Sequence, residues 1–269
     1  MAGLEAHYSA RDIETRILAA IRAAGMNPEQ RLSPEELGAL DHFHTGGLGA
    51  SRVLLDLARI QAEDRVLDIG AGLAGPARML ASTLGCRVDC LEMSADFCAG
   101  AALLNRLTGL SDRVAVHEGS ALNLPFSDES FDVVWMQNVG MNISDKQTLY
   151  TEIYRVLKSG GRFAFQEMAA GETPASYFPL PWATDPADNF LVSMDEMRSL
   201  LGASGFITEL LEDTSDVHLS GTTANATPAA PGKLGLAVYV DNLAQKAANA
   251  RRSLEEGQVR LVRGVFRVE

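Results

Sequence analysis

The sequence predicts an α/β protein built around a doubly wound, mostly parallel β-sheet of seven strands, with a helical cap at the N-terminus. Two observations lead to this fold class. In the middle of the chain, short apolar runs alternate with amphipathic helical segments over about 100 residues, which is typical of parallel strands joined by crossover helices. The first apolar run also ends in a glycine-rich turn, and open α/β sheets bind ligands at such turns.

The glycine-rich turn follows the run Val66-Leu67-Asp68-Ile69. Gly70 and Gly72 allow backbone angles that a Cβ forbids and let a ligand approach the main chain. The stretch from Gly70 to Gly75 also matches the G-x-G-x-x-G pattern of dinucleotide enzymes, which on its own is a weak signal. Asp68, however, places a carboxylate two residues before the first glycine, and a pyrophosphate disfavours a nearby anion. The turn therefore favours a ligand with a positively charged end.

Each strand and helix of the sheet region is predicted from its apolar period and its turn residues. Gly160 and Gly161 are expected to end the helix that precedes the fifth strand. The expected strands are 65–69, 87–92, 113–118, 131–137, 161–167, 206–211 and 259–268. The expected helices of the same region are 76–84, 95–107, 145–157, 194–204 and a long one over 235–254.

The first 45 residues look like an appended cap, which would leave residues 46–269 as the main domain. Apolar residues spaced three and four apart predict a helix over 11–24, and Ser33-Pro34 begins a second helix that runs to about residue 40. An irregular polar loop, Asp41 to Gly47, leads into a helix at 48–60. Two further loops are expected, a Pro- and aromatic-rich segment at 171–190 that hangs over the pocket mouth and a low-complexity loop at 221–232.

Composition is that of an ordinary globular protein, with 269 residues, 46% hydrophobic and 22% charged. The formal net charge of −12 disfavours nucleic acid and anionic membranes as partners. We find no signal peptide and no apolar run long enough to span a membrane. The spacing of Cys86, Cys90 and Cys98 is not a metal pattern, so we expect reduced thiols, no metal and a cytoplasmic location.

Four motifs in order resemble the class I S-adenosylmethionine-dependent methyltransferases, over about residues 41–212. The residues of these motifs are similar to those of the small-molecule branch, which includes ubiquinone/menaquinone-type, sarcosine/dimethylglycine and sugar O-methyltransferases. The motifs are Val66-Leu67-Asp68-Ile69-Gly70-Ala71-Gly72, Leu91-Glu92-Met93-Ser94, Leu122-Asn123-Leu124-Pro125-Phe126 with Phe131-Asp132-Val133-Val134, and Arg155-Val156-Leu157-Lys158-Ser159-Gly160-Gly161.

The resemblance implies a Rossmann-like methyltransferase sheet and S-adenosyl-L-methionine as cofactor, with S-adenosyl-L-homocysteine as product. It also implies methyl transfer to an O, N or activated C atom of a small-molecule metabolite. Within the main domain, residues 62–170 would form the cofactor-binding core and residues 171–192 an acceptor-side insert.

The resemblance also assigns roles to individual residues. Asp68 and the Gly70–Gly72 backbone would face the methionine end of the cofactor, and Glu92 would accept hydrogen bonds from both ribose hydroxyls. Met93 would lie against adenine or else belong to the core. The family commonly has an acid where Ser120 stands, so the adenine contacts there are weaker. The implied cofactor contacts are Thr45, Asp68, Gly70, Ala71, Gly72, Glu92, Met93, Ser120, Ala121, Leu122 and Asn138.

The candidates for catalysis are His44, in the polar loop, and Asn138, after the fourth strand. His44 could hydrogen-bond the cofactor or take a proton from the substrate, and His42 could do the same; the alternative is that both only pack or cap the loop. A general base is needed only if the nucleophile must lose a proton. His7 and Tyr8 would fold over the pocket.

Three other functions stay open at this point, namely an NAD(P)-dependent oxidoreductase, a non-catalytic S-adenosylmethionine-binding protein and a protein methyltransferase. Asp68 and the order of the motifs disfavour the first, and an enclosed pocket disfavours the third. Four aromatics suit a flat, apolar or cationic acceptor or else belong to the core, namely Phe43, Tyr177, Phe178 and Trp182. The acceptor, its reacting atom and the oligomeric state, a homodimer included, are left open.

Overall fold

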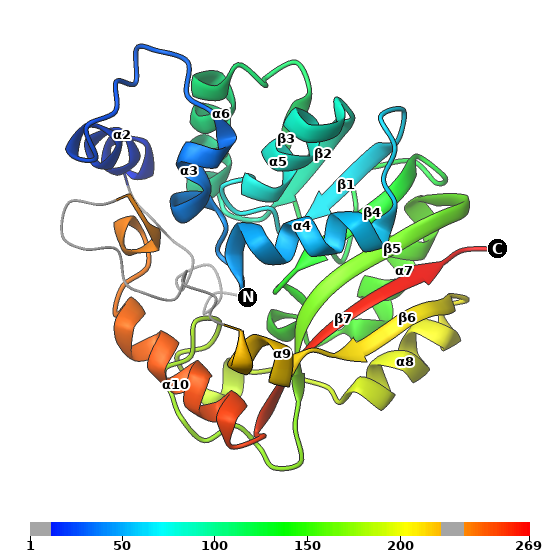
Figure 1. Cartoon of the computed structure of the whole chain (residues 1–269). Coiled ribbons are helices and arrows are strands. Elements are labelled where there is room, and N and C mark those ends of the chain that lie inside the picture. The colour runs from blue at the N-terminus through cyan, green and yellow to red at the C-terminus, as the bar shows by residue number, and fades with distance from the viewer. Residues whose placement is uncertain (1–11, 222–233) are drawn as a thin grey trace.

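The computed structural model describes residues 12–221 and 234–269. Their centre is a seven-stranded sheet in the order β3-β2-β1-β4-β5-β7-β6 (Figure 1). Strands β1 to β5 run parallel, and β7 is antiparallel to both of its neighbours, β5 and β6. The predicted mostly parallel sheet of seven strands is thus confirmed. The strands are β1 (Arg65–Ile69), β2 (Arg87–Glu92), β3 (Val114–Glu118), β4 (Phe131–Gln137), β5 (Leu157–Ala170), β6 (Ile207–Asp213) and β7 (Val259–Arg267).

Helices cover both faces of the sheet because its parallel strands are apolar on both sides. On one face, Leu54 of α4 (Gly47–Ala58) and Leu80 of α5 (Gly75–Leu84) pack in one cluster with Val66 and Trp135. On the other face, α7 (Lys146–Val156) and α8 (Met194–Ala203) pack against the alternate strand residues, such as Leu67 and Phe163. Further helices of the described residues are α6 (Ala95–Thr108), α9 (Ser215–Ser220) and α10 (Leu243–Glu255).

The N-terminal helices are α2 (Ile13–Ala23), which lies beside α6, and α3 (Pro34–Asp41), which lies beside α5; both are in blue at the upper left of Figure 1. They share one buried cluster with Leu73 of the glycine-rich loop and with Tyr239. The Tyr239 hydroxyl donates a hydrogen bond of 2.7 Å to the Leu40 carbonyl oxygen. Ser33 and Glu36 form the capping box that begins α3, as the Ser-Pro signal predicted. These contacts tie the end of α3 to the binding edge of the sheet.

The predicted boundaries differ most from the structure at two places, the start of the long C-terminal helix and the fifth strand, which was predicted at 161–167 and is Leu157–Ala170; both errors have a local cause. The expected helix over 235–254 is a short 3₁₀ helix, Leu236–Val238, followed by α10 from Leu243. Asn242 has a left-handed backbone (φ 54°) and separates the two. Gly160 and Gly161 do not end a helix, because α7 already stops at Val156 and the extended Leu157 pairs with Phe131 at the start of β5.

Helix α9 was not expected at all. The predicted contact of His7 and Tyr8 with the pocket lies outside the described residues, as does the predicted loop beyond residue 221.

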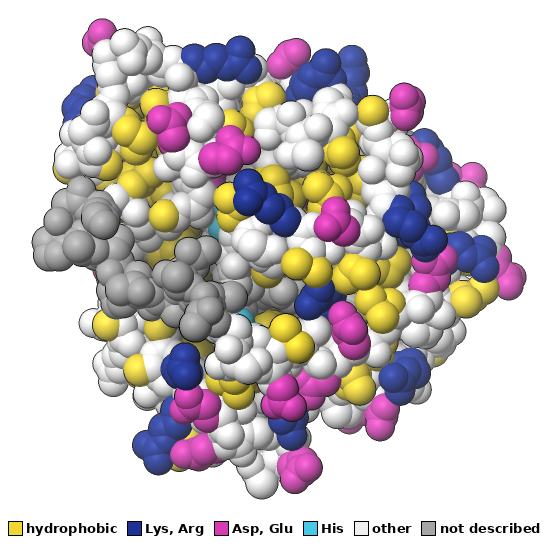
Figure 2. All heavy atoms as spheres, viewed as in Figure 1, with side chains coloured by type: hydrophobic (Ala, Val, Ile, Leu, Met, Phe, Trp, Pro, Cys, Tyr) yellow, Lys and Arg dark blue, Asp and Glu magenta, His cyan; other side chains and the backbone are white. Residues whose placement is uncertain are grey.

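Figure 2 shows Lys and Arg side chains interspersed with Asp and Glu side chains over one face of the molecule. Among the described residues, no helix is both long and apolar enough to cross a membrane. Cys86 and Cys90 are buried free thiols, and Cys98 is a half-buried one.

Candidate active site

The glycine-rich loop is held at the ends of β1 and β2. The backbone N–H groups of Gly70 and Ala71 both donate to the Leu91 carbonyl oxygen, at 2.8 and 3.1 Å. Gly70 has a φ of 66°, and a Cβ there would overlap the side chain of Val139. Gly72 also has a positive φ, but the space where its Cβ would stand is open. The loop therefore offers bare backbone toward a free volume at Gly72.

Glu92 ends β2 and is 8% exposed. Its Oε2 accepts the Gly72 N–H and its Oε1 accepts the Ser94 N–H, both at 2.9 Å. Burial raises the pKa of this carboxyl, although the backbone hydrogen bonds partly offset the effect. Each carboxylate oxygen has further acceptor capacity, so the pair can still receive two vicinal hydroxyl groups. Geometry therefore permits the ribose contact that the resemblance implied.

Asp68 lies on β1, 2% exposed, and its Oδ2 has no hydrogen-bond partner among the described residues. Its pKa is raised to about 8, mainly by burial and also by the Glu92 carboxylate, against the lowering effect of the Arg78 guanidinium. An unpaired buried carboxylate is costly unless a cation or a proton neutralises it. A cation bound beside Asp68 would neutralise its carboxylate, and the assignment of this residue to the methionine end of the cofactor stays a prediction.

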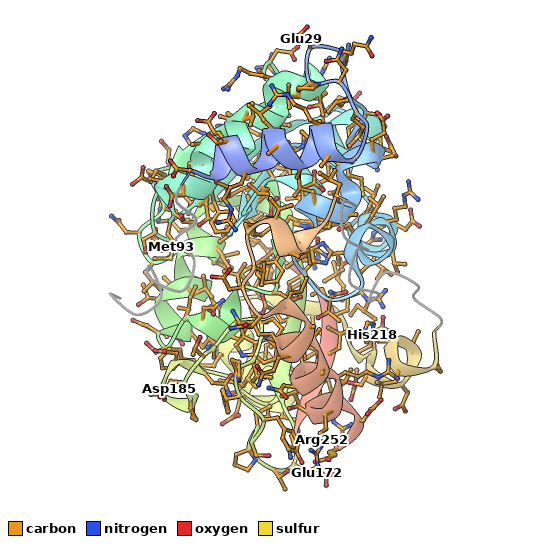
Figure 3. All side chains as sticks on the ribbon, turned by 90° about the vertical axis from the view of Figure 1, so that its left-hand side faces the viewer. Glu29, Met93, Glu172, Asp185, His218 and Arg252 are labelled. Carbon is orange, nitrogen blue, oxygen red and sulfur yellow. The ribbon has the colours of Figure 1, made fainter. Side chains whose placement is uncertain are left out.

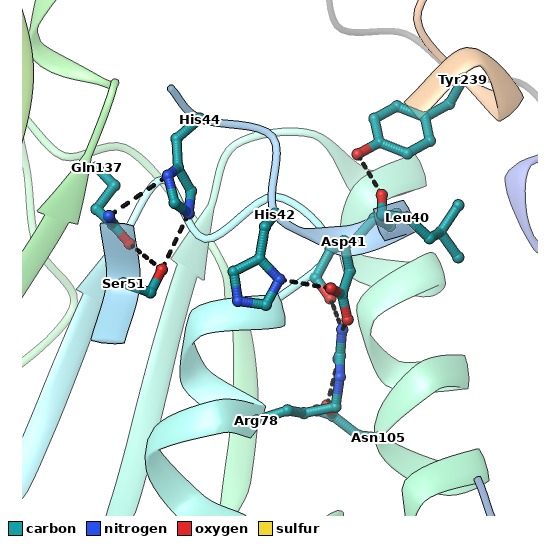
Figure 4. A network of polar contacts seen from close by, with 10 residues as sticks. Leu40, Asp41, His42, His44, Ser51, Arg78, Asn105, Gln137 and Tyr239 are labelled. Atoms are coloured by element: carbon teal, nitrogen blue, oxygen red, sulfur yellow. Dashed lines mark hydrogen bonds and ion pairs between the residues drawn. The ribbon is translucent and has the colours of Figure 1, made fainter. Parts of the chain in front are cut away.

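The C-terminal end of α3, which extends to Asp41, is fixed to α5 by a buried arginine (Figure 4). Arg78 is fully buried; it donates to Asp41 Oδ2 at 2.7 Å, to Asn105 Oδ1 at 2.8 Å and to the Leu73 carbonyl oxygen. The second Asp41 oxygen contacts His42 Nδ1 at 2.7 Å. Burial would raise the pKa of Asp41, but Arg78 and His42 outweigh it and hold the pKa below its usual value. His42 therefore belongs to this anchor.

A second hydrogen-bond network joins the loop between α3 and α4, residues 42–46 (the cap loop), and Ser51 of α4 to the end of β4 (Figure 4). The indole of Trp135, which can only donate, and the Ser51 hydroxyl both bond to Gln137 Oε1, at 3.0 and 2.9 Å. The Gln137 amide group then faces His44 Nδ1 at 3.4 Å, and His44 Nε2 lies 3.1 Å from Ser51 Oγ. These directions suit a neutral His44 protonated on Nε2, and burial lowers its pKa to about 3.

Thr45, in the cap loop, lies next to Asn138, which directly follows β4. Asn138 Nδ2 lies 3.5 Å from Thr45 Oγ1, and Gln166 Nε2 on β5 donates to the Thr45 carbonyl oxygen at 2.7 Å. Asn138 has a left-handed backbone (φ 56°) directly after β4. The ends of β4 and β5 thus hold Thr45 and Asn138 in place.

The adenine-side residues lie farther along the sheet. Met93 follows β2 and is half-buried; Figure 3 shows it on the flank between the N-terminal helices and Asp185. Ser120 is exposed after β3, and its hydroxyl accepts the Leu122 N–H at 3.2 Å. Ala121 and Leu122 pack against the core. Ser120 is therefore already used in a local turn, and the structure does not bring it to the Asp68 end of the site.

Glu167 is a buried acid that sequence reasoning missed. It is 2% exposed on β5, and its Oε1 accepts the N–H groups of Val139 and Gly140 at 2.9 and 3.0 Å. Burial raises its pKa to about 7, against the lowering effect of these bonds and of Lys146. The available signal was a pair of polar residues, Gln166 and Glu167, in an otherwise apolar run over residues 163–170. Gln166 and Arg78 were missed in the same way.

The predicted insert packs beside the site, and its aromatics are mostly structural. Trp182 is 3% exposed in a cluster with Met141 and Met168. Tyr177 donates to Glu256 at 2.7 Å and lies under the Arg252 guanidinium. A cavity of about 450 Å³ opens between the insert and Gln258; it is lined by Ala170, Gly171, Glu172, Thr173, Pro174, Ala175, Phe178, Pro186, Asn189, Leu191 and Gln258. Phe43 packs edge-on against Tyr239.

Comparison with known proteins places this geometry in context. Residues 67–165 match the family model described as a methyltransferase domain. The glycine/sarcosine/dimethylglycine N-methyltransferase of Actinopolyspora halophila is 39% identical over 114 residues, which are 42% of this chain and 20% of that protein. The sterol 24-C-methyltransferase of Eremothecium gossypii is 33% identical over 165 residues, 59% of this chain and 44% of that protein. The chain thus matches less than half the length of these relatives.

Solved structures show the same fold. Geranyl diphosphate C-methyltransferase from Streptomyces coelicolor A3(2), in complex with Mg²⁺, geranyl diphosphate and S-adenosyl-L-homocysteine, superposes with a TM-score of 0.68 and 18% identity, over 82% of this chain and 80% of that one. The fold of this chain is thus the Rossmann-like fold of these methyltransferases, and the matched segment, residues 67–165, covers β1 to the middle of β5. The matched domain and the matched relatives are those of the S-adenosylmethionine-dependent methyltransferases that the motifs resemble.

Proposed function

We propose that this protein transfers a methyl group from S-adenosylmethionine to an O, N or activated C atom of a small-molecule metabolite. The observation that carries the proposal is the pair of buried acids at the glycine-rich loop. Glu92 is bonded to the Gly72 N–H, and Asp68 has an unpartnered oxygen among the described residues. The two acids suit the opposite ends of one cofactor, because one has hydroxyl groups to bind and the other a cation.

The proposal assigns a task to each part of the cofactor site. Glu92 accepts the ribose hydroxyls, and Asp68 with the Gly70–Gly72 backbone receives the methionine end. The half-buried Met93 covers one face of adenine, and Ser120, Ala121 and Leu122 border its edge. Thr45 and Asn138, which already contact each other, lie at the methyl end.

Methyl transfer is an in-line displacement at a strong electrophile, so the protein mainly aligns the nucleophile and excludes water. S-adenosylmethionine supplies the activated methyl group when bound. We assign His44 and Asn138 to the reacting end as hydrogen-bonding groups. Neutral His44, with its low pKa, holds the loop and is a poor proton acceptor in this conformation. A base role would require His44 to leave Ser51 and Gln137.

The acceptor is proposed to bind between the cap, residues 1–45, and the insert, residues 171–192. The relatives whose names carry sarcosine, dimethylglycine and sterol substrates support a small-molecule acceptor. The net charge of −12 supports a protein that works without nucleic acid. We place it in the cytoplasm, and we propose that it acts as a homodimer.

Calorimetric titration with S-adenosylmethionine, S-adenosylhomocysteine and NAD in parallel tests the cofactor. We expect micromolar binding of both adenosyl ligands and its loss in Glu92→Ala. The matched control is Glu63→Ala, an exposed acid before β1 at the opposite end of the strand, which should bind normally. Binding of NAD alone would overturn the proposal. Binding of the adenosyl ligands without methyl transfer to any of a panel of amines, alcohols and activated carbon acids would instead favour a non-catalytic binding protein.

A further inference from the structure

The segment between β4 and α7, residues 138–145, connects the cofactor edge of the sheet to the insert. At its start, Asn138 lies against Thr45 of the cap loop. In its middle, the Met141 carbonyl oxygen accepts the Phe190 N–H at 3.0 Å. One short segment thus contacts the cap, the strand ends and the proposed acceptor side.

Glu167, on β5, binds the backbone of the first half of this segment. Its Oε1 receives two consecutive backbone N–H groups, of Val139 and Gly140, and so anchors the 3₁₀ turn Gly140–Asn142. Its Oε2 is buried without a hydrogen-bond partner among the described residues. Burying a carboxylate in this way is costly, so its benefit must lie in the backbone that it fixes.

Lys146 holds the second half. It is 6% exposed, and its ammonium donates to the Phe190 carbonyl oxygen at 2.7 Å and to the Ile143 carbonyl oxygen. Phe190 is therefore bound twice, through its N–H by Met141 and through its carbonyl by Lys146. Burial lowers the pKa of Lys146 to about 8, and the Glu167 charge opposes this.

We propose that Glu167 and Lys146 are positioning residues for methyl transfer. Together they clamp the segment 138–145 to β5 and to the insert at Phe190, and thereby fix the acceptor side against the methyl end of the cofactor. This inference rests on the proposed function. A misplacement of about 1 Å at a reacting centre can lower the rate about 100-fold. The cofactor contact proposed for Glu92, at the end of β2, lies outside the segment 138–145.

The test measures cofactor affinity and transfer separately in Glu167→Ala, Glu167→Gln and Lys146→Met. We expect Glu167→Ala and Lys146→Met to reduce kcat at least 10-fold on the best acceptor, while the Kd for S-adenosylhomocysteine changes less than about 3-fold. Glu167→Gln keeps an oxygen for the two N–H groups and should recover most of the activity. Lys158→Met is the control, a more exposed lysine paired with Asp132 away from the segment.

Hydrogen exchange provides a readout that needs no acceptor. Amides of residues 138–143 and 186–192 should exchange faster in Glu167→Ala and Lys146→Met, and those of β2 should not. Unchanged exchange, unchanged kcat, a parallel loss of cofactor affinity, or a Glu167→Gln variant as impaired as Glu167→Ala would each overturn the clamp. A wild-type protein that binds no adenosyl ligand would defeat the proposed function, while exchange would still decide the clamp.

Discussion

Gly75 and Asp41 are in direct van der Waals contact across the start of α5. A Cβ at Gly75 would overlap the Asp41 carbonyl oxygen and stand 2.7 Å from its Oδ1. The last glycine of the Gly70 to Gly75 pattern therefore allows the end of α3 to pack directly against α5. This is a physical reason for a third glycine that requires no phosphate, and it places Asp41 where Arg78 can bind it.

Replacing Gly75 by alanine should push α5 away from the end of α3. We expect Gly75→Ala to lower the free energy of unfolding by roughly 1–3 kcal/mol, the usual cost of an overpacked site. The control is Gly202→Ala in α8, where a Cβ meets no atom within 4 Å. Urea unfolding monitored by circular dichroism measures both variants, and equal midpoints would refute the explanation.

Removing the Ser51 hydroxyl should lower the free energy of unfolding, because this hydroxyl bonds to both His44 and Gln137. Ser51→Ala leaves a buried amide oxygen and an imidazole with one partner fewer, which typically costs about 1–3 kcal/mol. Ser82→Ala is the comparison, because that hydroxyl only bonds back to the Met79 carbonyl oxygen within its own helix. Equal unfolding curves for the two variants would show that the network contributes nothing.

The low pKa of His44 gives stability a definite dependence on pH. Folded His44 has a pKa of about 3, below its ordinary value of 6.5, so the unfolded chain binds the proton first as pH falls. The contribution is therefore complete above pH 6.5 and is lost progressively below it, by up to about 2 kcal/mol at pH 5. His44→Gln should lose less stability than wild type between pH 7.5 and pH 5 in urea titrations. Identical losses would contradict the assignment.

Cofactor binding should release a proton near neutral pH. Asp68, with a pKa raised to about 8 by burial, is mostly protonated in the free protein at pH 7 and should ionise when a cation binds beside it. Titrations with S-adenosylhomocysteine in phosphate and in Tris should then give different apparent enthalpies, and affinity should increase as pH rises toward 8. Asp68→Asn should abolish the difference between buffers. A wild-type enthalpy that is independent of the buffer would rule out this coupling.

Sequence alone predicted what local chemistry determines. The bounds of β1, β2 and β4 agree with the structure, because each is a short apolar run closed by polar or glycine residues. The position of Asp68 next to the glycines was also readable. Glu167 and Arg78 were not, since their partners lie 28 and 37 residues away in the chain and only the fold brings them together. The start of α10 failed because one left-handed residue interrupts a helical pattern.

The antiparallel strand β7 has a consequence for how the chain is made. Residues of β5 pair with partners about a hundred positions later, such as Arg162 with Arg267, and β6 joins the sheet through β7. During synthesis, β5 and β6 therefore emerge before the strand that joins them. A nascent chain that has not reached residue 259 presents two open edges, each a template for pairing with another chain. The sheet is therefore completed only late in synthesis. Aggregation competes most strongly with folding before β7 has joined β5 to β6.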